Sequence, residues 1–247
     1  LPTGEAQKLF TKTKSAISEL ELNTVCQEAR CPNIHECWGR GTATFMIAGQ
    51  VCTRGCKFCA VGSKKIPPLP DLDEPSNLAT AIKLMKLKHA VITVVNRDDL
   101  VDSGAEHYRK CIIEVNCQCP EVTLELLCSD LAGNIDDLKY LLNELPLHIF
   151  AHNVECVPRL DSIVRDPRAS FSQSLQILEE AKKIRPDILT KSSIMVGLGE
   201  TDEEVVEAMK LLREIDVDIL TIGQYLQPNQ KLLSVERFPE PQKFEEW

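Results

Sequence analysis

The sequence predicts an α/β fold, specifically a partial (β/α)6 barrel of the TIM type with extensions at both ends. Six apolar runs rich in Val, Ile, Leu and Thr recur after residue 43, and polar segments with helical periodicity separate them. This alternation is typical of parallel strands with crossover helices, whose sheets are covered on both faces. Six units are fewer than the eight of a closed barrel, so we expect an open one.

The predicted strands are short apolar runs, and the helices between them begin at capping residues. Thr201, followed by three acidic residues, predicts a helix start after the fifth strand, because the helix dipole favours negative charge in the first turn. The expected strands are 44–51, 90–96, 122–127, 148–154, 189–196 and 219–225, and further helices are expected over 102–115, 134–143 and 170–184.

The sequence divides into three expected segments. Residues 1–43 carry little β pattern and form an N-terminal extension over one mouth of the barrel, residues 44–226 form the barrel, and 227–247 form a C-terminal extension. Residues 65–75 and 227–244 read as irregular. Because the chain opens on Leu1 rather than Met and stops at Trp247 without a helix-ending signal, we expect the natural protein to continue beyond one or both ends.

Composition indicates which partners to exclude. Lys and Arg total 28 against 37 Asp and Glu, a net charge of −9, which disfavours nucleic acid as a partner. The first twenty residues contain no continuous hydrophobic segment, so neither a secretory signal nor a membrane span is expected. The expected location is therefore the cytoplasm.

Cysteine usage points to metal chemistry. The chain has 11 cysteines, an odd number that argues against a disulfide framework. Six of them crowd into residues 26–59, which in a reducing compartment indicates metal ligation. The other five match no ligand spacing, so we interpret them as buried or incidental thiols: Cys111, Cys117, Cys119, Cys128 and Cys156.

The first cysteine set follows the first predicted strand. Cys52, Cys56 and Cys59 lie in one tight loop, Cys52-Thr-Arg-Gly-Cys56-Lys-Phe-Cys59. Thiolates suit zinc, copper or iron–sulfur clusters; a zinc site would need a distant fourth ligand such as His35. A four-iron four-sulfur cluster would keep one iron free to chelate a cofactor. The motif resembles that of the radical S-adenosylmethionine (radical SAM) superfamily, which implies such a cluster with S-adenosylmethionine bound to its open iron.

A second set lies upstream, with Cys26, Cys31 and Cys37 spaced by four and five residues. The two sets could pool six thiols on a zinc pair, or each could hold its own cluster. The segment Asn23-Thr-Val-Cys-Gln-Glu-Ala-Arg-Cys-Pro-Asn-Ile-His-Glu-Cys-Trp38 resembles the N-terminal signature of lipoyl synthases, and the likeness continues through 41–46, 96–100, 152–155, 191–201 and 222–228.

The resemblance implies two four-iron four-sulfur clusters, the second of which donates sulfur. It further implies insertion of sulfur at carbons six and eight of an octanoyl group on a lipoyl carrier protein, with an electron donor such as ferredoxin or flavodoxin. The clusters and S-adenosylmethionine would carry the chemistry, so no catalytic side chain is expected. The family's Arg-Ser-Ser motif, whose serine is the second cluster's fourth ligand, is absent here; we expect it beyond Trp247.

Strand ends at the carboxyl face of a barrel hold its active site. By analogy with the superfamily, we expect contacts to S-adenosylmethionine there, with the planar guanidinium of Arg165 suited to its carboxylate and glycine allowing close backbone approach. The expected cofactor contacts are Phe58, Asp98, Asn153, Glu155, Arg165, Ser192, Gly197, Glu200 and Tyr225.

Three positions depart from the family pattern: Asn96 replaces the usual Asp, Ser193 the usual Gly, and Leu232 the usual His. They keep open a sulfur-inserting radical enzyme with another substrate. A non-catalytic iron–sulfur or zinc module is the alternative from a different class, and it would need no S-adenosylmethionine site at the strand ends.

Overall fold

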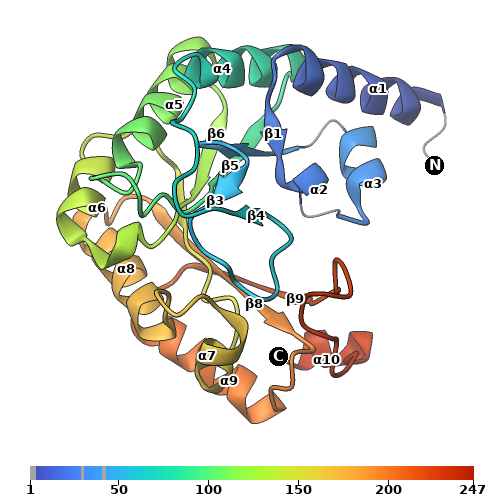
Figure 1. The fold of residues 1–247 in the computed structure, drawn as a ribbon, viewed down its shortest axis with the longest axis vertical. Helices are drawn as coiled ribbons and strands as arrows, with labels where there is room; N and C mark the ends of the chain where they lie inside the picture. The colour runs from blue at the N-terminus through green and yellow to red at the C-terminus, as the bar shows by residue number, and fades with distance from the viewer. Residues whose placement is uncertain (1–3, 29–30, 41–42) are drawn as a thin grey trace.

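A parallel sheet forms the centre of the computed structural model, which describes residues 4–28, 31–40 and 43–247. Six parallel strands lie side by side in chain order, and the short β1 pairs with the first of them in antiparallel orientation. Figure 1 shows the sheet curving inside an outer arc of helices that runs from α4 to α9. The strands of this sheet are β1 (Asn23–Thr24), β2 (Thr44–Ile47), β5 (His89–Val94), β6 (Thr123–Leu127), β7 (Ile149–Ala151), β8 (Leu189–Val196) and β9 (Ile219–Gln224).

All six predicted strands are present and lie in the expected order, so the prediction of a partial α/β barrel is confirmed. The strand cores are fully buried because helices cover the outer face, as at Ile92, Leu124 and Phe150. The first strand is shorter than predicted. It ends at Ile47, because Ala48 and Gly49 adopt positive φ angles of 66° and 102° and turn the chain.

The turn at Ala48 starts the cysteine loop. Beyond it, β3 (Val51–Cys52) leaves the main sheet and pairs with β4 (Gly62–Ser63). The cysteine segment between β3 and β4 is thereby closed at its base, and the Lys64 amide donates to the Cys52 carbonyl at 3.0 Å. The loop is a small structural unit at the carboxyl end of β2.

The helices agree with their capping signals. Ser170 and Asn134 cap α8 (Phe171–Ile184) and α6 (Ile135–Leu142), and Thr201 forms a capping box with Glu204 at the start of α9 (Asp202–Glu214). The helix predicted over 102–115 is α5 (Ala105–Gln118) and begins later. The Asp102 carboxylate accepts the amides of Gly104 and Glu106, which makes a turn before the helix.

Several helices were not predicted. They are α1 (Gly4–Glu19), α2 (Val25–Glu28), α3 (Ile34–Gly39), α4 (Glu74–Met85), α7 (Asp161–Val164) and α10 (Pro241–Glu246). Helix α4 begins directly after a proline-rich stretch of the sequence. Pro75 is tolerated in the first turn of α4, because a backbone amide at that position has no hydrogen-bond partner within the helix. The helix α10 begins within the stretch 227–244, which the sequence predicted to be irregular, and continues two residues beyond it.

The N-terminal segment packs on the barrel rather than standing apart from it. Helix α1 contacts α3 and α4, and α2 contacts β2. Figure 1 shows α2 and α3 on the open side of the sheet, opposite the outer helices. The division of the chain at residues 43 and 226 stays a prediction. In the described part of the chain, no helix is both long and apolar enough to cross a membrane.

Candidate active site

A cavity of about 1070 Å³ opens at the carboxyl ends of the strands. Its walls come from the cysteine loop, from the segments that follow β5, β6 and β7, and from the chain after β9. Parallel strands direct the residues after their carboxyl ends to one edge, where barrel enzymes bind their substrates. Both cysteine sets contribute to this cavity: Cys52, Cys56 and Cys59 from the first set, and Cys31 from the upstream set.

The thiols of Cys52, Cys56 and Cys59, here called the loop trio, each accept a backbone hydrogen bond. The Arg54 amide donates to Cys52 Sγ at 3.4 Å, the Asp166 amide to Cys56 Sγ at 3.3 Å, and the Val61 amide to Cys59. Burial raises the pKa of Cys56 to about 11, with Glu155 and Cys59 adding to the effect. Amides aimed at sulfur stabilise thiolate ligands and tune an iron–sulfur cluster, so the trio fits such a group.

Arg54 fastens the cysteine loop to the barrel, and the sequence analysis did not single it out. Its side chain is 2% exposed and forms ion pairs with Asp98 at 2.7 Å and Asp130 at 2.6 Å. These carboxylates follow β5 and β6, respectively. Burial alone would raise the pKa of Asp98, but hydrogen bonds from Arg54 and Thr53 outweigh it and keep that pKa below its usual value. An arginine between two cysteines of the predicted cluster motif is the signal that could have revealed this role.

A second clamp holds the other side of the loop. The Asp166 carboxylate accepts the Gly55 amide at 2.8 Å and pairs with Arg168, while Arg168 donates to the Thr53 carbonyl at 2.7 Å. The Arg168 hydrogen bond is the first cause of the lowered pKa of Asp166. Polar contacts from the segments after β5, β6 and α7 therefore position the loop trio.

Cys26, Cys31 and Cys37 are here called the N-terminal trio. Cys26 lies on α2, Cys37 lies on α3, and Cys31 lies between the two helices. The Cys31 amide donates to the Cys26 carbonyl at 3.1 Å, which links the first two cysteines of this trio. Burial raises the pKa of Cys37, and the nearby Cys26 and Cys31 raise it further. Phe10 stacks on the ring of His35 at 5.1 Å and contacts Trp38 at 5.5 Å.

The spacing of the thiols argues against a single zinc ion in either trio. Tetrahedral zinc with bonds of about 2.3 Å holds its sulfur ligands about 3.8 Å apart. Among the described residues, neither trio brings its three sulfur atoms within 4.8 Å of one another. A cubane cluster spreads its thiolates over separate irons, so wider spacing fits it better.

Five of the nine predicted cofactor contacts line the cavity. Phe58 comes from the cysteine loop, Asn153 and Glu155 from the end of β7, Arg165 from the end of α7, and Tyr225 from the end of β9. Burial raises the pKa of Glu155, and the nearby Arg165 opposes this shift. The positive φ of 68° at Glu155 marks a strained backbone beside the cysteine loop.

The other four predicted contacts lie outside the cavity lining and have protein partners. Asp98 pairs with Arg54, and the Ser192 hydroxyl accepts the Val154 amide at 3.2 Å. The Glu200 carboxylate accepts the amides of Gly197 and Leu198, which closes the turn after β8. Their roles toward S-adenosylmethionine stay predictions.

The three departures from the family pattern lie at or near the cavity. Asn96 and Leu232 line it, and the Ser193 carbonyl accepts the Glu155 amide at 3.1 Å. Of the five remaining thiols, Cys117 is exposed and the other four are buried. Cys128 is one of these four and also borders the cavity.

Comparisons with known proteins identify the class. Residues 46–212 match the profile of the radical SAM superfamily. The chain is 49% identical to the human mitochondrial lipoyl synthase over its whole length and covers 67% of that protein. It is also 49% identical to the chloroplastic lipoyl synthase of Arabidopsis thaliana, covering 63% of it, and to the lipoyl synthase of Ectopseudomonas mendocina, covering 67%.

The chain therefore belongs to the radical SAM superfamily and, within it, to the lipoyl synthase family. Membership implies an enzyme that uses S-adenosylmethionine and a four-iron four-sulfur cluster. Among solved structures, the hydrogenase maturase HydG of Carboxydothermus hydrogenoformans matches 98% of this chain and 67% of its own with a TM-score of 0.64 at 12% identity. Methylornithine synthase matches 96% of this chain and 72% of its own with a TM-score of 0.60, also at 12% identity. These likenesses support the barrel fold alone.

The expected cytoplasmic location is wrong. Among the relatives, the human protein is named as mitochondrial and the Arabidopsis protein as chloroplastic. The expectation relied on the first twenty residues, which carry no hydrophobic segment.

Proposed function

We propose that this protein converts an octanoyl group on a lipoyl carrier protein into a lipoyl group by inserting sulfur at carbons six and eight. In this proposal the loop trio and the N-terminal trio each hold a four-iron four-sulfur cluster, and the second cluster is the sulfur donor. The observation that carries it is that all three cysteines of the loop trio and Cys31 of the N-terminal trio line one cavity. When bound, the loop-trio cluster and S-adenosylmethionine together supply the radical that removes hydrogen from carbon.

The residues of the chain position and shield the reactants. Arg54, Asp166 and Arg168 hold the loop trio against the strand ends. Arg165 is buried at the cavity wall, where its guanidinium suits the carboxylate of S-adenosylmethionine. Asn153 in the same wall can donate to and accept from a ribose. Helices α2 and α3 lie on the open side of the sheet, where we expect them to limit the access of water to the radical.

The partners follow from the reaction. The carrier must present its acyl-lysine arm to the cavity mouth between the trios, and an electron donor such as ferredoxin or flavodoxin must reduce the loop-trio cluster. We expect no nucleic acid partner at a net charge of −9.

Product analysis on the full-length protein tests this function. Protein loaded with iron and sulfide without oxygen is mixed with a strong reductant, S-adenosylmethionine and an octanoylated carrier peptide. We expect about eight irons per chain, 5′-deoxyadenosine, and a lipoyl peptide in the mass spectrum. Absence of 5′-deoxyadenosine supports a non-catalytic module and overturns the proposal. Formation of 5′-deoxyadenosine without lipoyl product, on protein that carries both clusters, supports a different substrate.

A further inference from the structure

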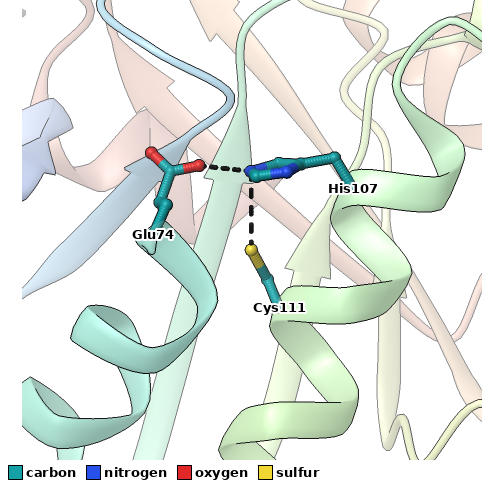
Figure 2. Close-up of side chains that lie close together, drawn as sticks. All are labelled: Glu74, His107 and Cys111. Carbon is teal, nitrogen blue, oxygen red and sulfur yellow. Dashed lines mark hydrogen bonds and ion pairs between the residues drawn. The ribbon is translucent and has the colours of Figure 1, made fainter. Parts of the chain in front are cut away.

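Three potential metal ligands meet outside the cavity, between helices α4 and α5. Figure 2 shows Glu74, His107 and Cys111 directed toward one another. His107 Nε2 lies 2.5 Å from Glu74 Oε2 and 3.8 Å from Cys111 Sγ, and the three donor atoms fall within 4.8 Å of one another. In the part of the chain that the structure describes, this is the single group of Cys, His, Asp and Glu that meets this spacing.

Local structure explains how the three donors converge. His107 and Cys111 are four residues apart on α5, so they lie one turn apart on the same helix face. Glu74 is the first residue of α4, and α4 packs against α5. The convergence therefore depends on two helices that the barrel fold holds side by side.

The donors are shielded as structural metal ligands are. Cys111 is fully buried, Glu74 is 6% exposed, and the His107 side chain is 12% exposed. Burial raises the pKa of Cys111, and the Glu74 charge adds to this, so without a cation the thiol stays protonated. A bound cation reverses that balance, because it stabilises the thiolate directly.

A hydrogen-bonded Glu–His pair beside a buried thiol is the simpler alternative. It explains the contact between Glu74 and His107, but it gives Cys111 no strong partner, since a thiol at 3.8 Å from nitrogen is a weak one. A carboxylate, an imidazole and a thiolate together form a donor set that zinc prefers.

We propose that Glu74, His107 and Cys111 form a binding site for a divalent cation of the zinc type, separate from both cysteine trios. Three protein ligands leave one position for water. Binding requires Cys111 to release its thiol proton to solvent and His107 Nε2 to carry no hydrogen, so affinity rises with pH.

The site is connected to the cysteine loop. Glu74 Oε2 also accepts the Ala48 amide at 2.8 Å, and Arg97 donates to the Ala48 carbonyl at 3.0 Å. Ala48 is the left-handed residue at which β2 turns toward Cys52. A cation at this position would therefore fix the turn that leads into the loop trio, and its role would be structural.

Zinc binding to cluster-loaded protein tests the proposal. Fully loaded full-length protein is dialysed against zinc and its bound zinc is measured, next to the variants Cys111→Ala and His107→Gln. Cys117→Ala is the matched control, because Cys117 is an exposed thiol on the same helix. We expect one zinc per chain in the wild type and the control, and affinity at least about a hundredfold weaker in both site variants.

X-ray absorption at the zinc edge identifies the ligands without interference from iron. We expect one sulfur at about 2.3 Å, with nitrogen and oxygen at about 2.0–2.2 Å. No zinc binding, or equal binding by Cys111→Ala and wild type, overturns the proposal. So does a shell of two or more sulfurs, which points to the cysteine trios. If a variant does not fold, judged by circular dichroism and iron content, the wild-type spectrum decides alone.

Discussion

The two cysteine trios are held in place by different physical means. Around the loop trio, buried ion pairs of Arg54 with residues after β5 and β6, and a hydrogen bond to Asp166 after α7, fix the backbone. The N-terminal trio lies on two short helices and the segment between them, near the packed rings of Phe10 and Trp38. The ion pair next to it, Arg40 with Glu36, is exposed, with side chains 75% and 61% accessible. The barrel thus fixes one trio rigidly, and short helices with apolar packing hold the other.

The largest expected effect separates the trios by their chemistry. Cys56→Ala should lower 5′-deoxyadenosine formation by more than about a hundredfold, because the loop trio would lose a ligand. Cys37→Ala should retain 5′-deoxyadenosine formation but yield no lipoyl product. Anaerobic assays with mass spectrometry measure both, and Cys117→Ala is the exposed thiol control. Equal loss of 5′-deoxyadenosine in both variants would contradict separate roles.

The ion pairs of the two regions should differ in their contribution to stability. Arg54→Met leaves the carboxylates of Asp98 and Asp130 without their buried partner, which costs about 3–5 kcal/mol and lowers the melting temperature by about 10 °C. Arg40→Met removes an exposed pair and should cost less than about 1 kcal/mol. Calorimetry on cluster-loaded protein compares them. Similar shifts would show that burial does not distinguish the two pairs.

Acid should lower the free energy of unfolding through the buried side chain of His152. Its ring contacts the Cys128 carbonyl and the Ser174 hydroxyl, both at 2.9 Å, and burial lowers its pKa from 6.5 to about 4. Below pH 6.5 the unfolded chain takes up a proton that the folded chain does not, so stability falls as pH drops toward 4. Between pH 7 and pH 5 the loss is about 2 kcal/mol.

Melting temperatures at pH 7 and pH 5 measure this loss. His152→Gln should remove much of the pH dependence, because glutamine does not titrate. His89→Gln is the control, since His89 is 46% exposed at the opposite end of the strands. An unchanged pH profile in His152→Gln would assign the acid sensitivity to other groups.

The smallest expected effects on stability concern one aromatic residue of the N-terminal segment, Trp38, and one of the barrel, Tyr108. Trp38 is 1% exposed, yet its indole nitrogen has no hydrogen-bond partner among the described residues. Trp38→Phe removes that unpaired group along with packing, so its net cost should stay within about 1 kcal/mol. Tyr108→Phe loses hydrogen bonds to the Val95 and Ser103 carbonyls and should cost about 1–2 kcal/mol. Thermal unfolding measures both losses of stability, and a larger loss in Trp38→Phe than in Tyr108→Phe would contradict this prediction.

The sequence alone determined the strand order, the capped helices and both thiol trios. These features depend on local signals: hydrophobic runs, the Thr201 capping box and short cysteine spacings along one stretch of chain. Such signals are readable because their partners lie within a few residues of one another. The N-terminal helices α1 and α3 were missed, since much of their stability comes from packing against each other and α4.

Tertiary structure decided the contacts that join distant residues. Arg54 meets Asp98 and Asp130, which lie 44 and 76 residues further along the chain. Glu74 meets His107 across 33 residues. Sequence spacing carries no signal for such pairs, because the side-by-side packing of strands and helices alone sets their distance. The same packing placed Asn153, Glu155 and Tyr225 in the cavity wall, whereas Ser192 and Glu200 lie outside its lining and bind backbone amides.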